Sequence, residues 1–147
     1  MYFRHWRTAK WLGSRSPSSR NAISTLFSKV SSSSRTSIRA FRPIVYICSP
    51  YAGDIETNVA AAKRYCRHAV DAGYIPIAPH LLFPQFLNDA DPNERQLGLF
   101  FGNALMSKCS EVWVFGKTIS AGMQAEINRA KWKNYRLRYF TEECQEV

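Results

Sequence analysis

The residue in this chain best suited to chemistry is Glu126, in the segment Ser120-Ala121-Gly122-Met123-Gln124-Ala125-Glu126. The spacing of apolar residues there predicts a helix with Met123, Ile127 and Ala130 on one stripe. Glu126 lies three residues after Met123 and four before Ala130, so it shares that stripe. A carboxylate on the sheet side, near a helix start, would be kept ionised by the helix dipole. Such a group can attack an electrophilic carbon.

Glu126 also has a purely structural interpretation. It could lie at the edge of the apolar stripe, where it would pair with Arg129 or accept hydrogen bonds from backbone donors. Spacing alone leaves both interpretations open.

The start of the same helix offers an anion site. Ser120 is the expected N-cap, which is its structural role. Its hydroxyl, with the free N–H groups of Gly122 and Met123, is also suited to bind phosphate. Gly122 would let a ligand come close to the backbone. The two roles can coexist.

Two further loops carry candidate binding residues. Ser49 and Tyr51 follow the apolar run that ends in Ile47-Cys48. His80 follows a second run and is expected in an apolar loop over residues 79–84. Ligands of open α/β sheets bind at the carboxyl ends of strands, so we expect these three side chains to line a site. Phe83 could stack on a base or simply cover the sheet edge. The structural alternatives are a plain turn at residues 49–54 and a structural histidine.

The elements that must position these residues alternate along the chain. Strands are predicted at 43–48, 74–78, 111–115 and 135–140, and helices at 57–72, 91–108 and 121–132. Pro76 favours an edge strand, and Leu97 and Phe100 are expected to face the core. This order predicts an α/β three-layer sandwich, flavodoxin-like or Rossmann-like, with a mostly parallel sheet of four to five strands.

Charge divides the chain into two parts. The net charge is +9, but residues 1–42 hold nine basic and no acidic residues, whereas residues 43–147 hold eleven of each. We therefore expect a basic, Ser- and Arg-rich segment over 1–42 and a folded domain over 43–147. The segment could be a disordered extension, an organelle-targeting sequence in a eukaryote or a nucleic-acid-binding arm.

The remaining composition bounds the class of protein. No apolar stretch approaches the roughly 20 residues of a membrane span, which predicts a soluble protein without membrane contact. The four cysteines are scattered, with no pair at metal-ligand spacing, which favours a reducing, cytoplasmic compartment and no metal site. No cofactor is expected.

Several motifs together resemble the nucleoside 2-deoxyribosyltransferase-like superfamily. They are Ile47-Cys48-Ser49-Pro50-Tyr51, then Ala78-Pro79-His80, and then Trp113-Val114-Phe115-Gly116 followed by Ser-x-Gly-Met-x-x-Glu. Over residues 43–140 the chain looks most like the small domains of unknown function that phage and bacterial genomes carry within that group. The resemblance implies a flavodoxin-like fold and a homo-oligomer whose sites are completed by a neighbouring subunit. It also implies a nucleoside or nucleotide ligand.

By motif position, the resemblance makes Glu126 the nucleophile that attacks C1′ of a 2′-deoxynucleoside. Ser120 stands where related monophosphate hydrolases carry a serine that contacts phosphate, which favours a phosphorylated ligand. One position departs from the pattern. Gly102 and Asn103 lie where these enzymes usually have an aspartate, and Asn103 can hydrogen-bond a base but cannot be its general acid. A non-catalytic, nucleotide-binding module therefore stays open as an alternative, as does a protein acting on nucleic acid through its basic segment.

Overall fold

The computed structural model describes residues 40–147, and Phe41–Val147 form one compact unit. The basic segment expected over residues 1–42 lies almost entirely outside the described residues. Its targeting, nucleic-acid-binding or disordered character therefore stays a prediction. None of the helices within the described range has both the length and the apolar character needed to cross a membrane.

The elements of this unit alternate between strand and helix. In chain order they are β1 (Ile44–Cys48), α2 (Ile55–Asp71), β2 (Ile75–Ile77), α3 (Pro79–Leu82), the 3-10 turn η1 (Phe83–Gln85), α4 (Pro92–Met106), β3 (Glu111–Phe115), α5 (Ala121–Trp132) and β4 (Arg136–Phe140).

All four strands are parallel, in the order β2-β1-β3-β4. The predicted α/β class with a parallel sheet is confirmed, and β2, which contains Pro76, lies at an edge as expected. The chain leaves β1 toward β2 on one side and later returns to β3 on the other. The carboxyl ends of β1 and β3 therefore form the point where an open α/β sheet places its ligand crevice.

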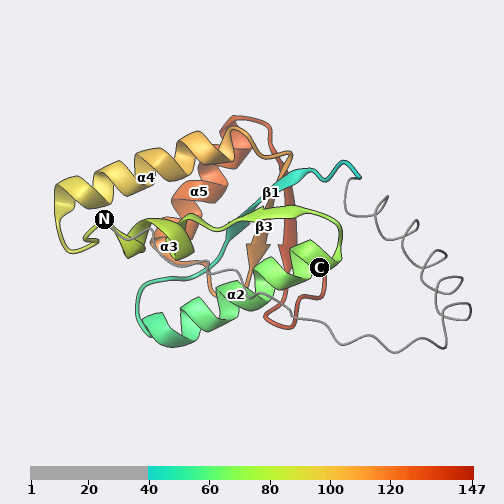
Figure 1. The fold of residues 1–147 in the computed structure, drawn as a ribbon, viewed down its shortest axis with the longest axis horizontal. Helices are drawn as coiled ribbons and strands as arrows, with labels where there is room; N and C mark the ends of the chain where they lie inside the picture. The colour runs from blue at the N-terminus through green and yellow to red at the C-terminus, as the bar shows by residue number, and fades with distance from the viewer. Residues whose placement is uncertain (1–39) are drawn as a thin grey trace, which may run out of the picture. The chain divides into compact units, whose positions relative to one another are not determined.

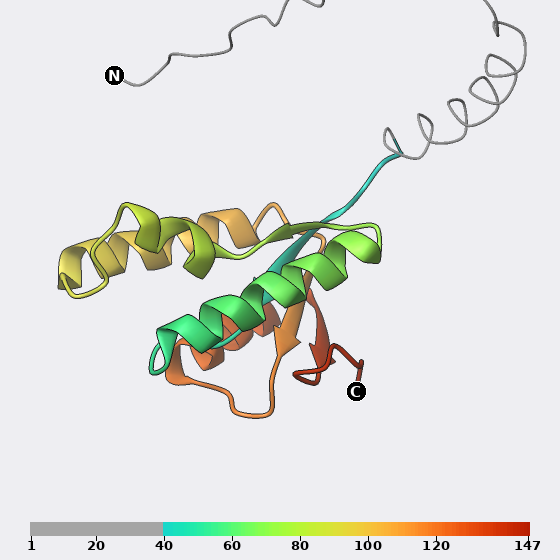
Figure 2. The same ribbon diagram turned by 60° about the horizontal axis from the view of Figure 1, so that its bottom comes forward.

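Side-chain alternation along the strands sends residues to two helical layers. Tyr46 and Cys48 point toward α4 and α5, where they join a core with Met123 and Ile127. The intervening residues of β1 point to the other face, under α2. Figure 1 shows α4 and α5 on one side of the strands and α2 on the other, the three-layer arrangement that the element order predicts. Figure 2 gives the same elements from below.

Helix boundaries follow local capping chemistry. Asp54 caps α2 by accepting a hydrogen bond from the Thr57 backbone, so this helix begins two residues earlier than predicted. Asp91 caps α4, and Pro92 occupies its first position. Asn134 ends α5 with a left-handed backbone at φ 56°.

Two expectations about residues 79–106 are wrong. The apolar stretch 79–84 is not an irregular loop, because Pro79 starts the short helix α3 and η1 follows directly. Leu97 and Phe100 do not face the core, since they are 43% and 66% exposed. Apolar residues lie all around α4, so its sequence period does not single out one buried face.

Candidate functional site

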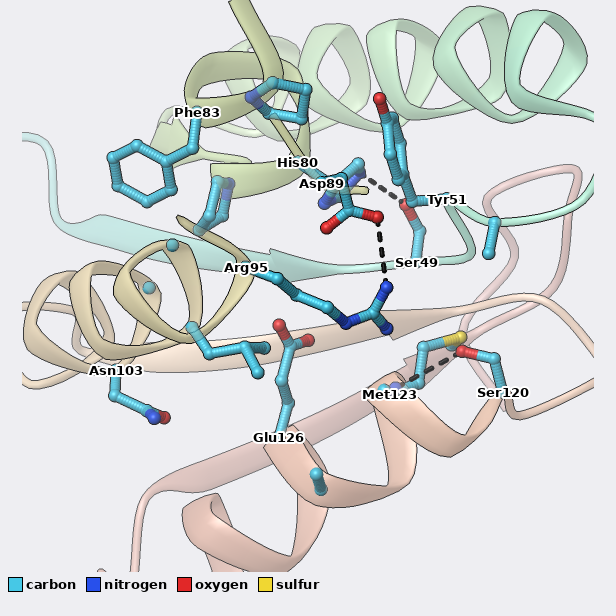
Figure 3. Close-up of a pocket in the computed structure, with 18 of the residues that line it drawn as sticks. Ser49, Tyr51, His80, Phe83, Asp89, Arg95, Asn103, Ser120, Met123 and Glu126 are labelled. Carbon is cyan, nitrogen blue, oxygen red and sulfur yellow. Dashed lines mark hydrogen bonds and ion pairs between the residues drawn. The ribbon is translucent and has the colours of Figure 1, made fainter. Parts of the chain in front are cut away.

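A cavity of about 510 Å³ opens at the carboxyl ends of β1 and β3. This volume is in the range of small-molecule sites. All eight candidate residues from the sequence line it: Ser49, Tyr51, His80, Asn103, Ser120, Gly122, Met123 and Glu126. Figure 3 shows how they converge from the β1 loop, α3, α4 and α5. The structure thus brings together residues that are up to 77 positions apart in the sequence.

Glu126 points from α5 into this cavity and is held by Tyr46 of β1. The Tyr46 hydroxyl donates a hydrogen bond of 2.7 Å to Glu126 Oε1. Among the described residues, no ion pair joins Glu126 to Arg129. The structural interpretation based on that pair is therefore wrong. Glu126 is a partly buried carboxylate with an oriented donor beside a cavity.

The environment of Glu126 makes ionisation harder than in water. Burial raises the pKa of this carboxyl above its ordinary value, and hydrogen bonds from Tyr46 and Cys48 offset part of that increase. The helix dipole was expected to help keep Glu126 ionised, and burial acts in the opposite direction. A carboxylate that is poorly solvated is a better nucleophile than one surrounded by water.

Two buried side chains fix the geometry beneath Glu126. Burial raises the pKa of Tyr46 well above its ordinary value, so its hydroxyl stays a hydrogen-bond donor. The Cys48 thiol lies 3.9 Å from the Met123 carbonyl oxygen, to which it donates a weak hydrogen bond. These contacts tie the first turns of α5 to β1. The position of Glu126 therefore depends on two residues of β1.

Ser49 and His80 form a second polar pair in the cavity. Ser49 Oγ and His80 Nε2 are 3.0 Å apart, and the Tyr51 ring lies 6.3 Å from the imidazole. Burial lowers the pKa of His80 to about 4, so the imidazole is neutral near pH 7. A neutral imidazole has one donor and one acceptor nitrogen. It can orient a sugar or base, but it brings no positive charge.

The start of α5 has the N-cap that its sequence predicts, but the cap uses one of the two N–H groups expected to be free for an anion. Ser120 Oγ accepts a hydrogen bond from Met123 N at 3.3 Å, which makes Ser120 the N-cap. The first turn of α5 contains no acidic residue. Its positive dipole end is therefore not neutralised by its own side chains.

Gly102, near the position of the missing aspartate, lies close to the Tyr46 hydroxyl. A Cβ atom there would lie 3.3 Å from the Tyr46 hydroxyl oxygen and 3.7 Å from Pro79. Any larger side chain would press on the hydroxyl that holds Glu126. Asn103, the next residue, lines the cavity and offers an amide in place of a carboxylate.

Sequence reasoning missed several side chains at the cavity, among them Tyr46, Asp89 and Arg95. Tyr46 could have been found, because alternation along β1 places it on the face of α5. Asp89 and Arg95 flank the predicted Asp91-Pro92 helix start and form an ion pair of 3.1 Å at the cavity. The first turn of α4 lies at the cavity, and this position at the start of a predicted helix is the signal that could have indicated Arg95.

The described residues contain no group of three or more His, Cys, Asp or Glu side chains that could hold a metal ion. The cavity is lined instead by hydroxyl, amide, imidazole and charged side chains with an apolar wall that includes Phe83 and Leu87. This lining suits an organic ligand with a ring and polar substituents.

Fold and site define a parallel α/β protein with a polar ligand pocket at the switch point of its sheet. The chain belongs to the family described as "Domain of unknown function (DUF7768)", which matches residues 43–140. No curated protein matches the sequence.

Among solved structures, the fold is similar to that of a 2-deoxyribosyltransferase from Bacillus psychrosaccharolyticus. The TM-score is 0.54, with 14% identity over 67% of this chain and 72% of that chain. At this identity the similarity shows a shared fold. It supports the resemblance noted from the motifs at the level of fold.

Proposed function

We propose that this domain cleaves the N-glycosidic bond of a 2′-deoxynucleoside or its 5′-monophosphate, with Glu126 as the nucleophile. The observation that carries the proposal is the Glu126 carboxylate at the cavity, oriented by the Tyr46 hydroxyl at 2.7 Å. The structural neighbour is a 2-deoxyribosyltransferase described as a biocatalyst for nucleoside synthesis, which agrees with the proposed reaction class.

In the first step Glu126 Oε2 attacks C1′ of the deoxyribose, while Oε1 remains bonded to Tyr46. The C1′–O bond forms and the C1′–N bond breaks, and the base leaves with the bonding electron pair. The base then takes a proton from water. In the second step water, or the N–H nitrogen of another base, attacks C1′ and releases the Glu126 carboxylate. The proton lost by this attacking group neutralises the hydroxide left when the first base was protonated.

The other lining residues have positioning roles in this proposal. Ser49 and neutral His80 hold the sugar hydroxyl groups, and the Ser120 hydroxyl and the Gly122 backbone N–H hold the 5′ end. Tyr51 and Phe83 contact the ring systems, and the Asn103 amide hydrogen-bonds the base. A homo-oligomer that completes the site stays a prediction.

A second candidate function keeps the pocket without the reaction. It is favoured by the amide at Asn103 and the absence of a side chain at Gly102, since neither residue can protonate a leaving base. In that case the domain binds a nucleotide and releases no base.

The test is base release by the full chain. Deoxynucleosides and their 5′-monophosphates are incubated with the protein, and free base is measured by chromatography beside a Glu126→Gln control. Base release that depends on Glu126 supports the enzyme. Absence of release at protein concentrations where the same compounds bind refutes it and leaves the binding module.

The pH profile should report the raised pKa of Glu126. Only the ionised carboxylate is a nucleophile, so kcat/KM should fall as pH decreases, with a midpoint above the ordinary Glu value of 4.5. The pKa of His80 is about 4, so a His80→Asn variant should keep this midpoint. A midpoint at or below 4.5, or one that moves in His80→Asn, would contradict the assignment.

Removing the Tyr46 hydroxyl should slow the reaction without unfolding the domain. Tyr46→Phe is expected to reduce kcat/KM about 10- to 100-fold, the range for losing a hydrogen bond to a charged group. Because this bond lowers the pKa of Glu126, the acid midpoint should also move to higher pH. If Tyr46→Phe acted only by disturbing the structure, the acid midpoint of kcat/KM would not move.

Gly102→Ala provides a partner test for the same contact. The added methyl group would lie 3.3 Å from the Tyr46 hydroxyl oxygen and should displace it. We expect Gly102→Ala to lower kcat/KM and to move the acid midpoint to higher pH, in both cases by less than Tyr46→Phe. Gly98→Ala is the matched control on α4, because its added methyl group would have only an ordinary contact with Leu87 at 3.5 Å.

A further inference from the structure

Arg95 and Asp89 form an ion pair that reaches into the pocket. Arg95 Nη1 lies 3.1 Å from Asp89 Oδ2, and both side chains are about half exposed, at 55% and 49%. Both line the cavity that contains Glu126. Figure 3 shows the Arg95 side chain extending from α4 across the pocket, with Asp89 on one side and the Ser120 end of α5 on the other.

This pair is poorly explained as a stabilising contact. An exposed ion pair contributes little to folding, because water screens the charges and two flexible side chains must be held in place. Arg95 nevertheless presents a planar set of N–H donors that matches a carboxylate or a phosphate. The Asp89 carboxylate occupies guanidinium donors that an incoming anion could use.

The surroundings of the Arg95 guanidinium favour an anion with more charge than one carboxylate. The start of α5 contributes the Ser120 hydroxyl and the Gly122 backbone N–H to the lining, and its first turn has no acidic side chain. Arg129 is a second cation of the same lining, which also contains the carboxylates of Glu94 and Glu126. A phosphate monoester carries up to two negative charges and three acceptor oxygens, so it can displace Asp89 from Arg95.

We propose that Arg95 selects 5′-phosphorylated nucleotides over nucleosides, and that Asp89 occupies its guanidinium until the phosphate displaces it. The inference rests on the proposed function, which places the deoxyribose at Glu126 and the 5′ end toward α5. The inference predicts opposite effects on monophosphate affinity for substitutions at the two residues of the ion pair. Removing Arg95 weakens phosphate binding, whereas neutralising Asp89 strengthens it.

The test is calorimetric binding to the full chain carrying Glu126→Gln, so that turnover does not interfere. Three probes are titrated: a 2′-deoxynucleoside 5′-monophosphate, the corresponding deoxynucleoside and inorganic phosphate. Adding Arg95→Ala should weaken monophosphate binding at least about 10-fold and leave nucleoside binding unchanged. Adding Asp89→Asn should tighten monophosphate binding by about 2- to 5-fold.

The control is an exposed ion pair outside the pocket, Arg67 with Asp71 on α2. Arg67→Ala and Asp71→Asn should leave all three affinities unchanged. Equal losses for nucleoside and monophosphate in Arg95→Ala would overturn the inference, as would weaker monophosphate binding in Asp89→Asn. Inorganic phosphate binding that depends on Arg95, with no monophosphate preference over nucleoside, would also overturn it.

The inference and the proposed function fail in different ways. Base release that depends on Glu126 but is indifferent to Arg95 and to the phosphate refutes only the role of Arg95. Monophosphate binding that depends on Arg95, without base release by the wild-type chain, refutes only the reaction.

Discussion

Replacing Glu126 by Gln is expected to reduce the rate of base release at least about 10³-fold, because it removes the carboxylate oxygen that attacks C1′. The amide keeps the shape of the side chain and can still accept the hydrogen bond from Tyr46. Binding of the substrate should therefore stay within a few-fold of wild type. The measurement is single-turnover base release at saturating protein, which separates chemistry from binding.

Glu94→Gln is the matched control, because Glu94 is another carboxylate at the same cavity. Its side chain accepts a hydrogen bond from the Asn88 backbone, which an amide oxygen can also do. This variant should keep most of the activity. If Glu94→Gln abolished base release and Glu126→Gln did not, the nucleophile would be wrongly assigned.

The second large effect concerns stability. Trp113→Ala is expected to lower the free energy of unfolding by about 3–5 kcal/mol, the usual range for truncating a buried aromatic residue. Trp113 is 1% exposed in the centre of the sheet and packs against Phe140 at 4.9 Å between ring centroids. Its indole N–H also donates a 2.7 Å hydrogen bond to the buried Glu111. Such a loss approaches the whole stability of a small domain, about 5–15 kcal/mol.

Urea unfolding of the full chain gives this number, with Trp132→Ala as the control. Trp132 is 72% exposed at the end of α5, so its removal should change stability by less than about 1 kcal/mol. If both variants lowered the free energy of unfolding by similarly small amounts, Trp113 would not be part of the core beneath α2.

The fold could be predicted because its signals are local and agree with one another. The apolar run of β1 has no polar face, which is typical of a strand buried between two helical layers. Asp91-Pro92 fixed the start of α4, and Asn134 fixed the end of α5. Where the pattern was ambiguous the prediction failed. Phe100 sits on a helix with apolar residues all around, so its exposure depends on packing that the sequence does not encode locally.

The sequence indicated many of the residues that line the cavity, but few of the contacts between them. Glu126 shares a helical stripe, which indicates the direction of its side chain. The partner that holds it, Tyr46, lies 80 residues away and appears only when β1 and α5 are packed. Arg95 was missed because an arginine in a first helical turn usually points to solvent. Its placement across the cavity depends on how α4 sits over the sheet.

The central claim is that Glu126 forms a covalent bond to C1′. It is tested most directly by quenching the full chain with acid during turnover of a deoxynucleoside 5′-monophosphate and analysing its peptides by mass spectrometry. The account predicts one added deoxyribosyl phosphate on the peptide that contains Glu126, and none in Glu126→Gln. Steady base release with the sugar attached elsewhere, or attached to no residue at any quench time, would contradict it.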